Sequence, residues 1–151
     1  MMRQKDLLWV SGQLALFLVY LFTPEIVVLK KVQFFTNIGF VLMCLGAVIL
    51  VVVLLQLQSS LSPFPSPRKA TKLVTTGLFK WVRHPIYTGI LIILFGYSVA
   101  YASLSKLIIT IIFLNFFYWK AHYEETLLTV RFPAYKKYKT QVGMLFPKIK
   151  R

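Results

Sequence analysis

The amino-acid sequence predicts an all-α integral membrane protein: a bundle of four transmembrane helices followed by a cytosolic helical tail. Hydrophobic residues make up 58% of the chain and charged residues only 15%, a balance far from that of ordinary soluble proteins. The apolar residues gather into long runs separated by polar or proline-containing stretches, a pattern typical of membrane-spanning helices. The chain has 151 residues, and we expect a single membrane domain over residues 1–151.

The first two runs predict the first two spans. Run 7–22 follows a basic start, which is also typical of a signal peptide, but no small-residue cleavage pattern comes after it. We therefore expect an anchor helix there. Run 34–57 is long enough to cross a bilayer with some tilt. It contains Gly39 and Gly46, small residues that allow neighbouring helices to approach closely.

The second half of the chain predicts a loop and two more spans. Residues 58–76 combine prolines with serines and cations, a composition typical of a polar loop. Spans are expected over 86–102 and 106–131, and the very short connection between them makes them antiparallel neighbours. The apolar part of the last run is short for a full crossing, so its helix should project from the bilayer and end before Pro133.

The distribution of basic residues predicts the orientation. Only three of the 18 Lys and Arg residues, Lys30, Lys31 and Lys106, lie on one side of the predicted spans. Positive residues favour the cytoplasm, so both termini are expected there. The net charge of +14 is also typical of nucleic-acid binding, but the cations lie between and after apolar runs, as expected beside anionic lipid headgroups. We therefore expect membrane lipids, and no nucleic acid, as partners.

A polar corner lies at the start of the third span. Arg83 and His84 precede Pro85, which favours the first turn of a helix. The N–H groups and dipole of that helix end favour an anion. Polar residues at a membrane boundary are costly to place, which makes this corner a candidate functional site. Its cationic and aromatic residues also have a simpler interpretation, as contacts to lipid phosphates and as part of an interfacial aromatic belt.

An acidic pair is expected beside this corner. Glu124 and Glu125 leave the fourth span on the side where the third span begins, so the antiparallel arrangement brings Arg83 and Glu124 together. The tail, with its tyrosines and Phe146, should roof the resulting pocket. Alternatively, Glu124 pairs with Lys120 one helical turn earlier. Two histidines without a usual third ligand do not predict a metal site.

Taken together, these motifs resemble the isoprenylcysteine carboxyl methyltransferase family, and related phospholipid N-methyltransferases share a similar plan. The resemblance covers residues 63–147, about half the chain. Leu78 and Phe79 depart from the proline and tyrosine that the family commonly has there. The matching positions are Leu73-Val74-Thr75-Thr76-Gly77, Arg83-His84-Pro85-Ile86-Tyr87-Thr88-Gly89, Glu124-Glu125, Leu128, Phe132, Tyr135 and Tyr138.

The resemblance implies an S-adenosylmethionine-dependent methyltransferase whose cofactor region is about 73–147. It implies a lipid-like or prenylated acceptor at the cytosolic membrane face, with carboxyl methylation favoured over methylation of an amine. Arg83, Glu124 and Lys120 would be catalytic. The cofactor site would be lined by His84, Pro85, Tyr87 and Gly89, with Glu125 and Tyr135 as further candidates.

Two other functions stay open at this point. Membrane sterol-type reductases, which use NADPH, resemble the same C-terminal architecture. A non-catalytic membrane scaffold with a lipid-binding tail would also explain the basic, aromatic C-terminus. The sequence contains no glycine-rich loop after a strand, so a soluble doubly wound methyltransferase domain is not supported. The acceptor and the oligomeric state stay open.

Overall fold

The structure is a computed structural model that describes residues 4–25, 28–57 and 73–148. Within these residues the regular elements are helices, and the only bridges are two isolated ones, Val28 with Ser103 and Val82 with Gly143. The prediction of an all-α fold is therefore confirmed for the described part of the chain. The elements are α1 (Gln4–Phe22), α2 (Gln33–Leu57), the 3-10 turn η2 (Gly77–Lys80), α3 (Pro85–Ala100), α4 (Leu104–Arg131) and α5 (Tyr135–Gln141).

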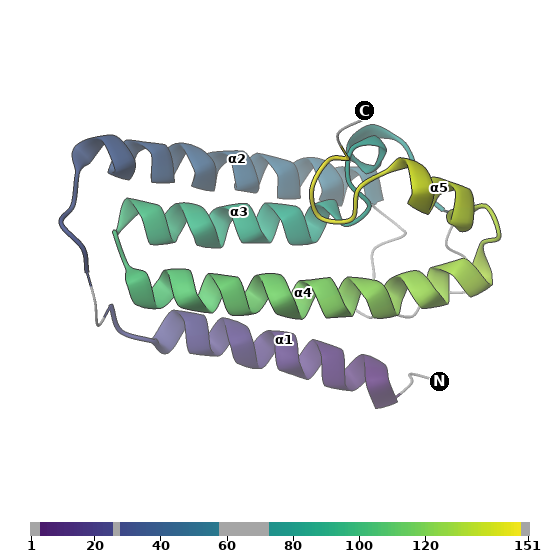
Figure 1. The fold of residues 1–151 in the computed structure, drawn as a ribbon, viewed down its shortest axis with the longest axis horizontal. Coiled ribbons are helices and arrows are strands. Elements are labelled where there is room, and N and C mark those ends of the chain that lie inside the picture. The colour runs from purple at the N-terminus through teal and green to yellow at the C-terminus, as the bar shows by residue number, and fades with distance from the viewer. Residues whose placement is uncertain (1–3, 26–27, 58–72, 149–151) are drawn as a thin grey trace.

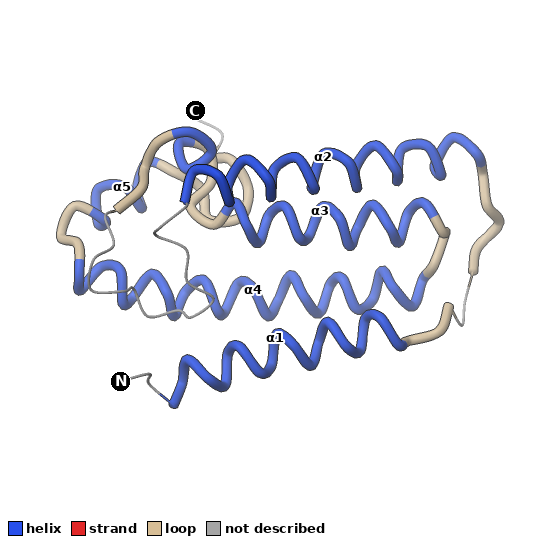
Figure 2. The backbone as a smooth tube through the Cα atoms, turned by 180° about the vertical axis from the view of Figure 1, so that it is seen from behind, coloured by secondary structure: helices blue, strands red, loops and turns tan. Residues whose placement is uncertain are grey.

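The four long helices lie side by side, in the order α2, α3, α4, α1 (Figure 1), and the view from behind shows the same order (Figure 2). The short turn between α3 and α4 makes them antiparallel neighbours, as predicted. The start of α1, the second half of α4 and α5 all lie at one end of the bundle, which we call the tail end. Most of the predicted loop 58–76 lies outside the described residues.

Three of the described helices, α1, α2 and α4, are long and apolar enough to cross a membrane. Helix α3 has 16 residues, so it rises only about 24 Å, less than the roughly 30 Å of a hydrocarbon core. It ends at Ala100, before the predicted boundary at residue 102. The reason is local, because Ala102 has a φ of 50°, a left-handed conformation that a helix cannot contain.

Helix α4 continues far beyond its apolar part and ends at Arg131, just before Pro133, as predicted. It begins at Leu104, where the Ser103 side chain accepts a hydrogen bond from the N–H of Lys106. Lys106, the first residue of the predicted span 106–131, thus lies in the first turn of the helix. Its side chain is buried, and its ammonium group donates to the Tyr20 carbonyl of α1.

Helices α2 and α3 pack closely through two pairs of glycines. A Cβ atom added to Gly39 would lie 2.5 Å from the carbonyl oxygen of Gly96, and one added to Gly46 would lie 2.7 Å from that of Gly89. Any larger side chain would therefore push the helices apart. The prediction that Gly39 and Gly46 permit close packing is confirmed.

Candidate functional site

The C-terminal tail is fastened across the start of α3. The N–H groups of Arg83 and His84 donate to the carbonyl oxygens of Gly143 (2.8 Å) and Met144 (3.1 Å). The Thr88 hydroxyl donates to the next tail carbonyl, at 2.7 Å. The sequence suggested an anion at this helix end, but these two N–H groups are already bound to the tail. The tail thus forms one wall of the polar corner.

Arg83 joins this corner to α4 and to the tail. Its Nε lies 2.6 Å from Oε1 of Glu125, and its Nη1 donates to the carbonyl oxygens of Lys139 (2.9 Å) and Val142. The side chain is only 7% exposed. The expected partner was Glu124, but successive residues of a helix point about 100° apart, and it is Glu125 that faces Arg83.

Glu125 is the centre of a charged cluster and is fully buried. Besides Arg83, its carboxylate lies 2.8 Å from the ammonium group of Lys139 and 3.3 Å from Nε2 of His84. A carboxylate without access to water requires such partners, since an unpaired buried charge is strongly destabilising. In the sequence, Lys139 is only one of several tail cations. Its position one turn after Tyr135 in the same short helix was the available signal.

Glu124 lies on the α3 side of the same cluster. It accepts a hydrogen bond of 2.5 Å from the Tyr87 hydroxyl, and its other oxygen lies 3.4 Å from Nδ1 of His84. The imidazole therefore bridges both glutamates. Burial lowers the pKa of His84, but the contacts with Glu124 and Glu125 outweigh burial and hold this pKa above its ordinary value. The rings of His84 and Tyr87 are parallel, and Tyr87 stacks in turn on Phe117 at 4.4 Å.

Lys120 connects the cluster to α1. The side chain is buried, and its ammonium group donates to Oε1 of Gln13 at 2.6 Å and lies 5.3 Å from the centre of the Tyr87 ring. The alternative pairing with Glu124 is replaced by this contact with α1. Gln13 was not among the residues expected at the site. An amide in the middle of an apolar run is itself a signal, because it needs a partner inside the membrane.

The tail tyrosines form a small apolar cluster of their own, and a roof over a pocket stays a prediction. Tyr135 and Tyr138 are buried and pack against Leu73, Leu128 and Phe132. The Tyr138 hydroxyl donates to the Phe79 carbonyl at 2.5 Å, and burial raises the pKa of Tyr138 to about 12. Burial, and then the charge of Glu125, raise the pKa of Tyr135 as well.

Not all of the other residues singled out from the sequence lie in the charged cluster. Phe146 is 64% exposed, and the neighbouring Leu145 is the tail residue that packs into the core. Pro85 is buried at the first position of α3, as predicted. Gly89 faces α2, where an added Cβ would lie 2.9 Å from the Leu50 side chain. His122 lies on another face of α4, with Nδ1 3.2 Å from the Tyr118 carbonyl.

A comparison with known families matches residues 34–135 to the family described as phospholipid methyltransferase. The match covers about two thirds of the chain and includes the polar corner, both glutamates and Tyr135. The chain belongs to the phospholipid methyltransferase family. No curated protein matches it.

This family member is also similar to a solved structure, that of a eukaryotic intramembrane Ras methyltransferase, isoprenylcysteine carboxyl methyltransferase. The TM-score is 0.72 and the sequence identity 28%; the match covers 97% of this chain and 53% of that protein. This chain thus spans about half the length of its structural relative. The resemblance seen in the sequence is confirmed, and the fold is that of a membrane methyltransferase.

The cluster combines three chemical features. The carboxylates of Glu124 and Glu125 provide negative charge, and that of Glu124 lies against the Tyr87 hydroxyl. His84 can accept or release a proton. The buried setting excludes water and strengthens the electrostatic interactions of these groups.

Proposed function

We propose that this protein transfers a methyl group from S-adenosylmethionine to a lipid-like or prenylated acceptor at the membrane face where the tail end lies. The observation that carries this proposal is the buried cluster of Arg83, His84, Glu124 and Glu125, which α3, α4 and the tail assemble from distant parts of the sequence. A methyltransferase family, a membrane fold and a charged, water-poor site at one end of the helices agree with this activity.

The residues present fit S-adenosylmethionine, which carries a sulfonium, an ammonium and a carboxylate. Glu124, the more exposed of the two carboxylates, complements the positive charges, while Glu125 holds Arg83, Lys139 and His84 in place. Protonated His84 complements the negative charge. The Tyr135 hydroxyl is buried and makes no hydrogen bond of good geometry with the protein. A buried polar atom of this kind can bind a polar group of a ligand. Accordingly, we assign the cofactor to His84, Tyr87, Glu125 and Tyr135, with Pro85 and Gly89 shaping the start of α3 beside them.

S-adenosylmethionine supplies an already activated methyl group, so the protein's main tasks are to align the acceptor and to exclude water. We assign alignment to Arg83, Glu124 and Lys120. Nε and one terminal nitrogen of Arg83 hold Glu125 and the tail, and the other terminal nitrogen is the group that we assign to an acceptor carboxylate. Such a carboxylate is ionised at neutral pH and needs no base.

We favour carboxyl methylation, and an amine acceptor is the second possibility. For an amine, Glu124 would take the proton, since its carboxylate is the more exposed of the two, at 16% against 0%. The family description, phospholipid methyltransferase, favours a lipid amine. The similarity to an isoprenylcysteine carboxyl methyltransferase favours a prenylated carboxylate. Both acceptors would enter sideways from the bilayer.

The proposal includes a topology. The three candidate spans and α3 would cross the membrane together, with both termini in the cytoplasm, because 15 of the 18 basic residues then lie on that side. A single cysteine at Ser105, in a Cys44→Ser background, should react from the side opposite to one at Thr140. Reaction of both from the same side would refute this arrangement.

The acceptor can be tested with purified protein in lipid nanodiscs, labelled S-adenosylmethionine and a panel of acceptors. The panel contains a prenylated cysteine with a free carboxylate, its amide, and phosphatidylethanolamine. We expect label in a base-labile methyl ester of the free acid and none in the amide. Label in phosphatidylethanolamine alone would support methyl transfer but identify a lipid amine, rather than a carboxylate, as the acceptor. Binding of NADPH without any methyl transfer would favour a sterol-type reductase, and no cofactor binding would favour a scaffold.

A further inference from the structure

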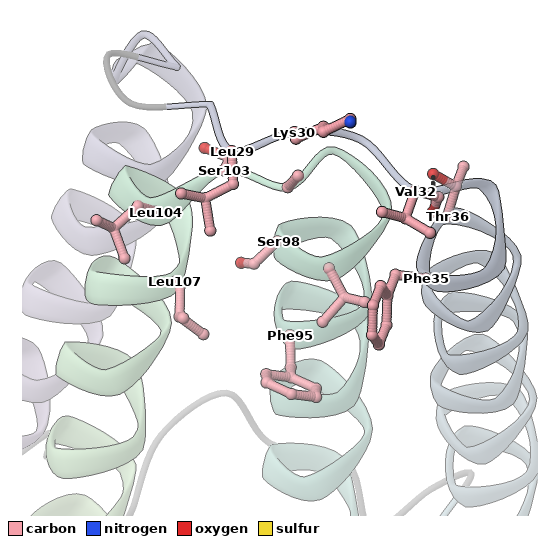
Figure 3. Close-up of a pocket in the computed structure, with 12 residues that line it drawn as sticks. Leu29, Lys30, Val32, Phe35, Thr36, Phe95, Ser98, Ser103, Leu104 and Leu107 are labelled. Carbon is pink, nitrogen blue, oxygen red and sulfur yellow. Dashed lines mark hydrogen bonds between the residues drawn. The ribbon is translucent and has the colours of Figure 1, made fainter.

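An apolar groove lies at the end of the bundle opposite to His84, between α2, α3 and α4 (Figure 3). Its volume is about 370 Å³. Phe35 of α2, Phe95 of α3 and Leu107 of α4 form its walls, and Lys30 lies across its top (Figure 3). The segment that carries Lys30 is held in place, because the N–H of Leu29 donates to the carbonyl of Ala102 at 2.9 Å.

The groove follows from the sequence at the end of α3 and just after it. Ser98 and Val99 of α3, and Ala102 beyond its end, present small side chains to the space between α2 and α4. The Ser98 hydroxyl turns back to the Leu94 carbonyl at 2.8 Å, so its polar atom is satisfied within the helix. The walls are therefore almost entirely apolar, and they leave room that no described side chain fills.

In a bilayer this room is open to lipid. Phe95 is 44% exposed and Leu104 is 37% exposed, although both line the groove. An unfilled groove would lose the dispersion contacts of its walls, whereas a lipid acyl chain restores them. The groove lies among membrane-spanning helices, so a lipid acyl chain is the apolar group present there at the highest concentration.

The rim of the groove selects the headgroup. Lys30 lines the top, and the ammonium group of Lys31 lies 5.4 Å from the centre of the Tyr101 ring, which holds a second positive charge nearby. Glu25, the acidic residue of this end, accepts a hydrogen bond from the Tyr97 hydroxyl. Adjacent basic residues at the edge of an apolar surface favour an anionic lipid over a zwitterionic one.

We propose that this groove binds one anionic phospholipid, with an acyl chain along Phe95 and Leu107 and the headgroup phosphate on Lys30. The site goes beyond the methyl transfer proposed above, because it lies at the other end of α3 from His84 and uses none of the cluster's residues. A lipid bound there would hold α2, α3 and α4 together at the C-terminal end of α3.

Native mass spectrometry of the protein released from nanodiscs tests this site. The nanodiscs contain equal amounts of phosphatidylglycerol and phosphatidylcholine. We expect one tightly held lipid, with phosphatidylglycerol retained at least about fivefold over phosphatidylcholine, the preference that one lysine supplies near an anionic lipid. Lys30→Gln should clearly lower this preference, whereas Lys148→Gln, which removes a lysine at the tail end, should keep it.

A second pair of variants tests the acyl chain. Leu107→Trp fills the groove and should release both lipids, whereas Ile108→Trp, at an exposed neighbour outside the groove, should release neither. Val99→Phe provides an independent filling variant if Leu107→Trp does not fold. Free glycerol phosphate should not displace the lipid. Equal retention of the two lipids by the wild type, equal behaviour of the two Trp variants, or displacement by glycerol phosphate would each overturn the proposal.

Discussion

Nε of Arg83 lies 2.6 Å from Oε1 of Glu125, although 42 residues separate the two in the sequence. Both side chains are nearly or fully buried, so this ion pair joins the start of α3 to α4 out of reach of water. The same guanidinium also binds two carbonyl groups of the tail. Arg83 and Glu125 thus tie together the three segments that form the candidate active site.

The first prediction concerns this ion pair. Glu125→Gln should lower the free energy of unfolding by roughly 3 kcal/mol, because Arg83 and His84 lose a buried counter-charge. Denaturant titration in a mild detergent measures this change. Glu25→Gln, which removes a partly exposed carboxylate at the opposite end, serves as the matched control. Equal stability of the wild type and Glu125→Gln would show that the pair does not hold the segments together.

The second prediction separates chemistry from binding at Glu124. Glu124→Gln keeps the shape of the side chain and removes its charge, while the Tyr87 hydroxyl can still donate to the amide oxygen. Turnover should fall about a hundredfold or more, within the range for removing a positioned catalytic group. Binding of S-adenosylmethionine should persist. Tyr87→Phe, which removes only the hydrogen bond to Glu124, should lose less. Wild-type turnover in Glu124→Gln would remove this residue from the catalytic set.

The third prediction concerns Gln13, which holds the ammonium group of Lys120 over the Tyr87 ring. Gln13→Leu should lower kcat about tenfold, since Lys120 then loses the acceptor that fixes its position. Gln13→Glu restores an acceptor and should recover most of the activity. Ser11→Ala, two residues before Gln13 on an exposed face of α1, is the control. A Gln13→Leu enzyme with unchanged kcat would show that α1 does not position Lys120.

The fourth prediction is a pH dependence of stability. The folded-state pKa of His84 lies above its ordinary value, so protonated His84 stabilises the folded protein. This contribution should be fully present below pH about 6.5, the unfolded value, and should be lost as the pH rises through the higher folded pKa. Thermal unfolding recorded across this range measures it. His84→Gln should flatten the profile, and an unchanged slope in that variant would assign the dependence to another group.

The sequence was sufficient to predict four long helices, the antiparallel pairing of α3 with α4, and the meeting of the polar corner with the acidic pair. A short connection between α3 and α4 forces that meeting, whatever the details of packing. The sequence could not predict which glutamate faces Arg83, because this depends on the rotation of α4 about its axis. That rotation is set by contacts such as the stacking of Phe117 on Tyr87.

The sequence also could not predict contacts between side chains of distant segments. The contact between Lys120 and Gln13 requires α1 to pack on α4, and no periodic pattern in the nearly uniform apolar run of α1 specifies that face. Gly89 was expected at the cofactor because it belongs to a recognisable motif. The structure places it against α2, where the approach of two backbones requires a glycine.

The most direct test of the account is the affinity for S-adenosylmethionine, measured by isothermal titration calorimetry in lipid nanodiscs for three proteins: the wild type, His84→Ala and His122→Ala. His122 is the chain's other histidine and lies on another face of α4, so its variant is a matched control. We expect measurable binding by the wild type and His122→Ala. For His84→Ala we expect an affinity at least about tenfold weaker, the usual effect of losing one good polar contact. Unchanged affinity in a folded His84→Ala protein would contradict the placement of the cofactor at this cluster.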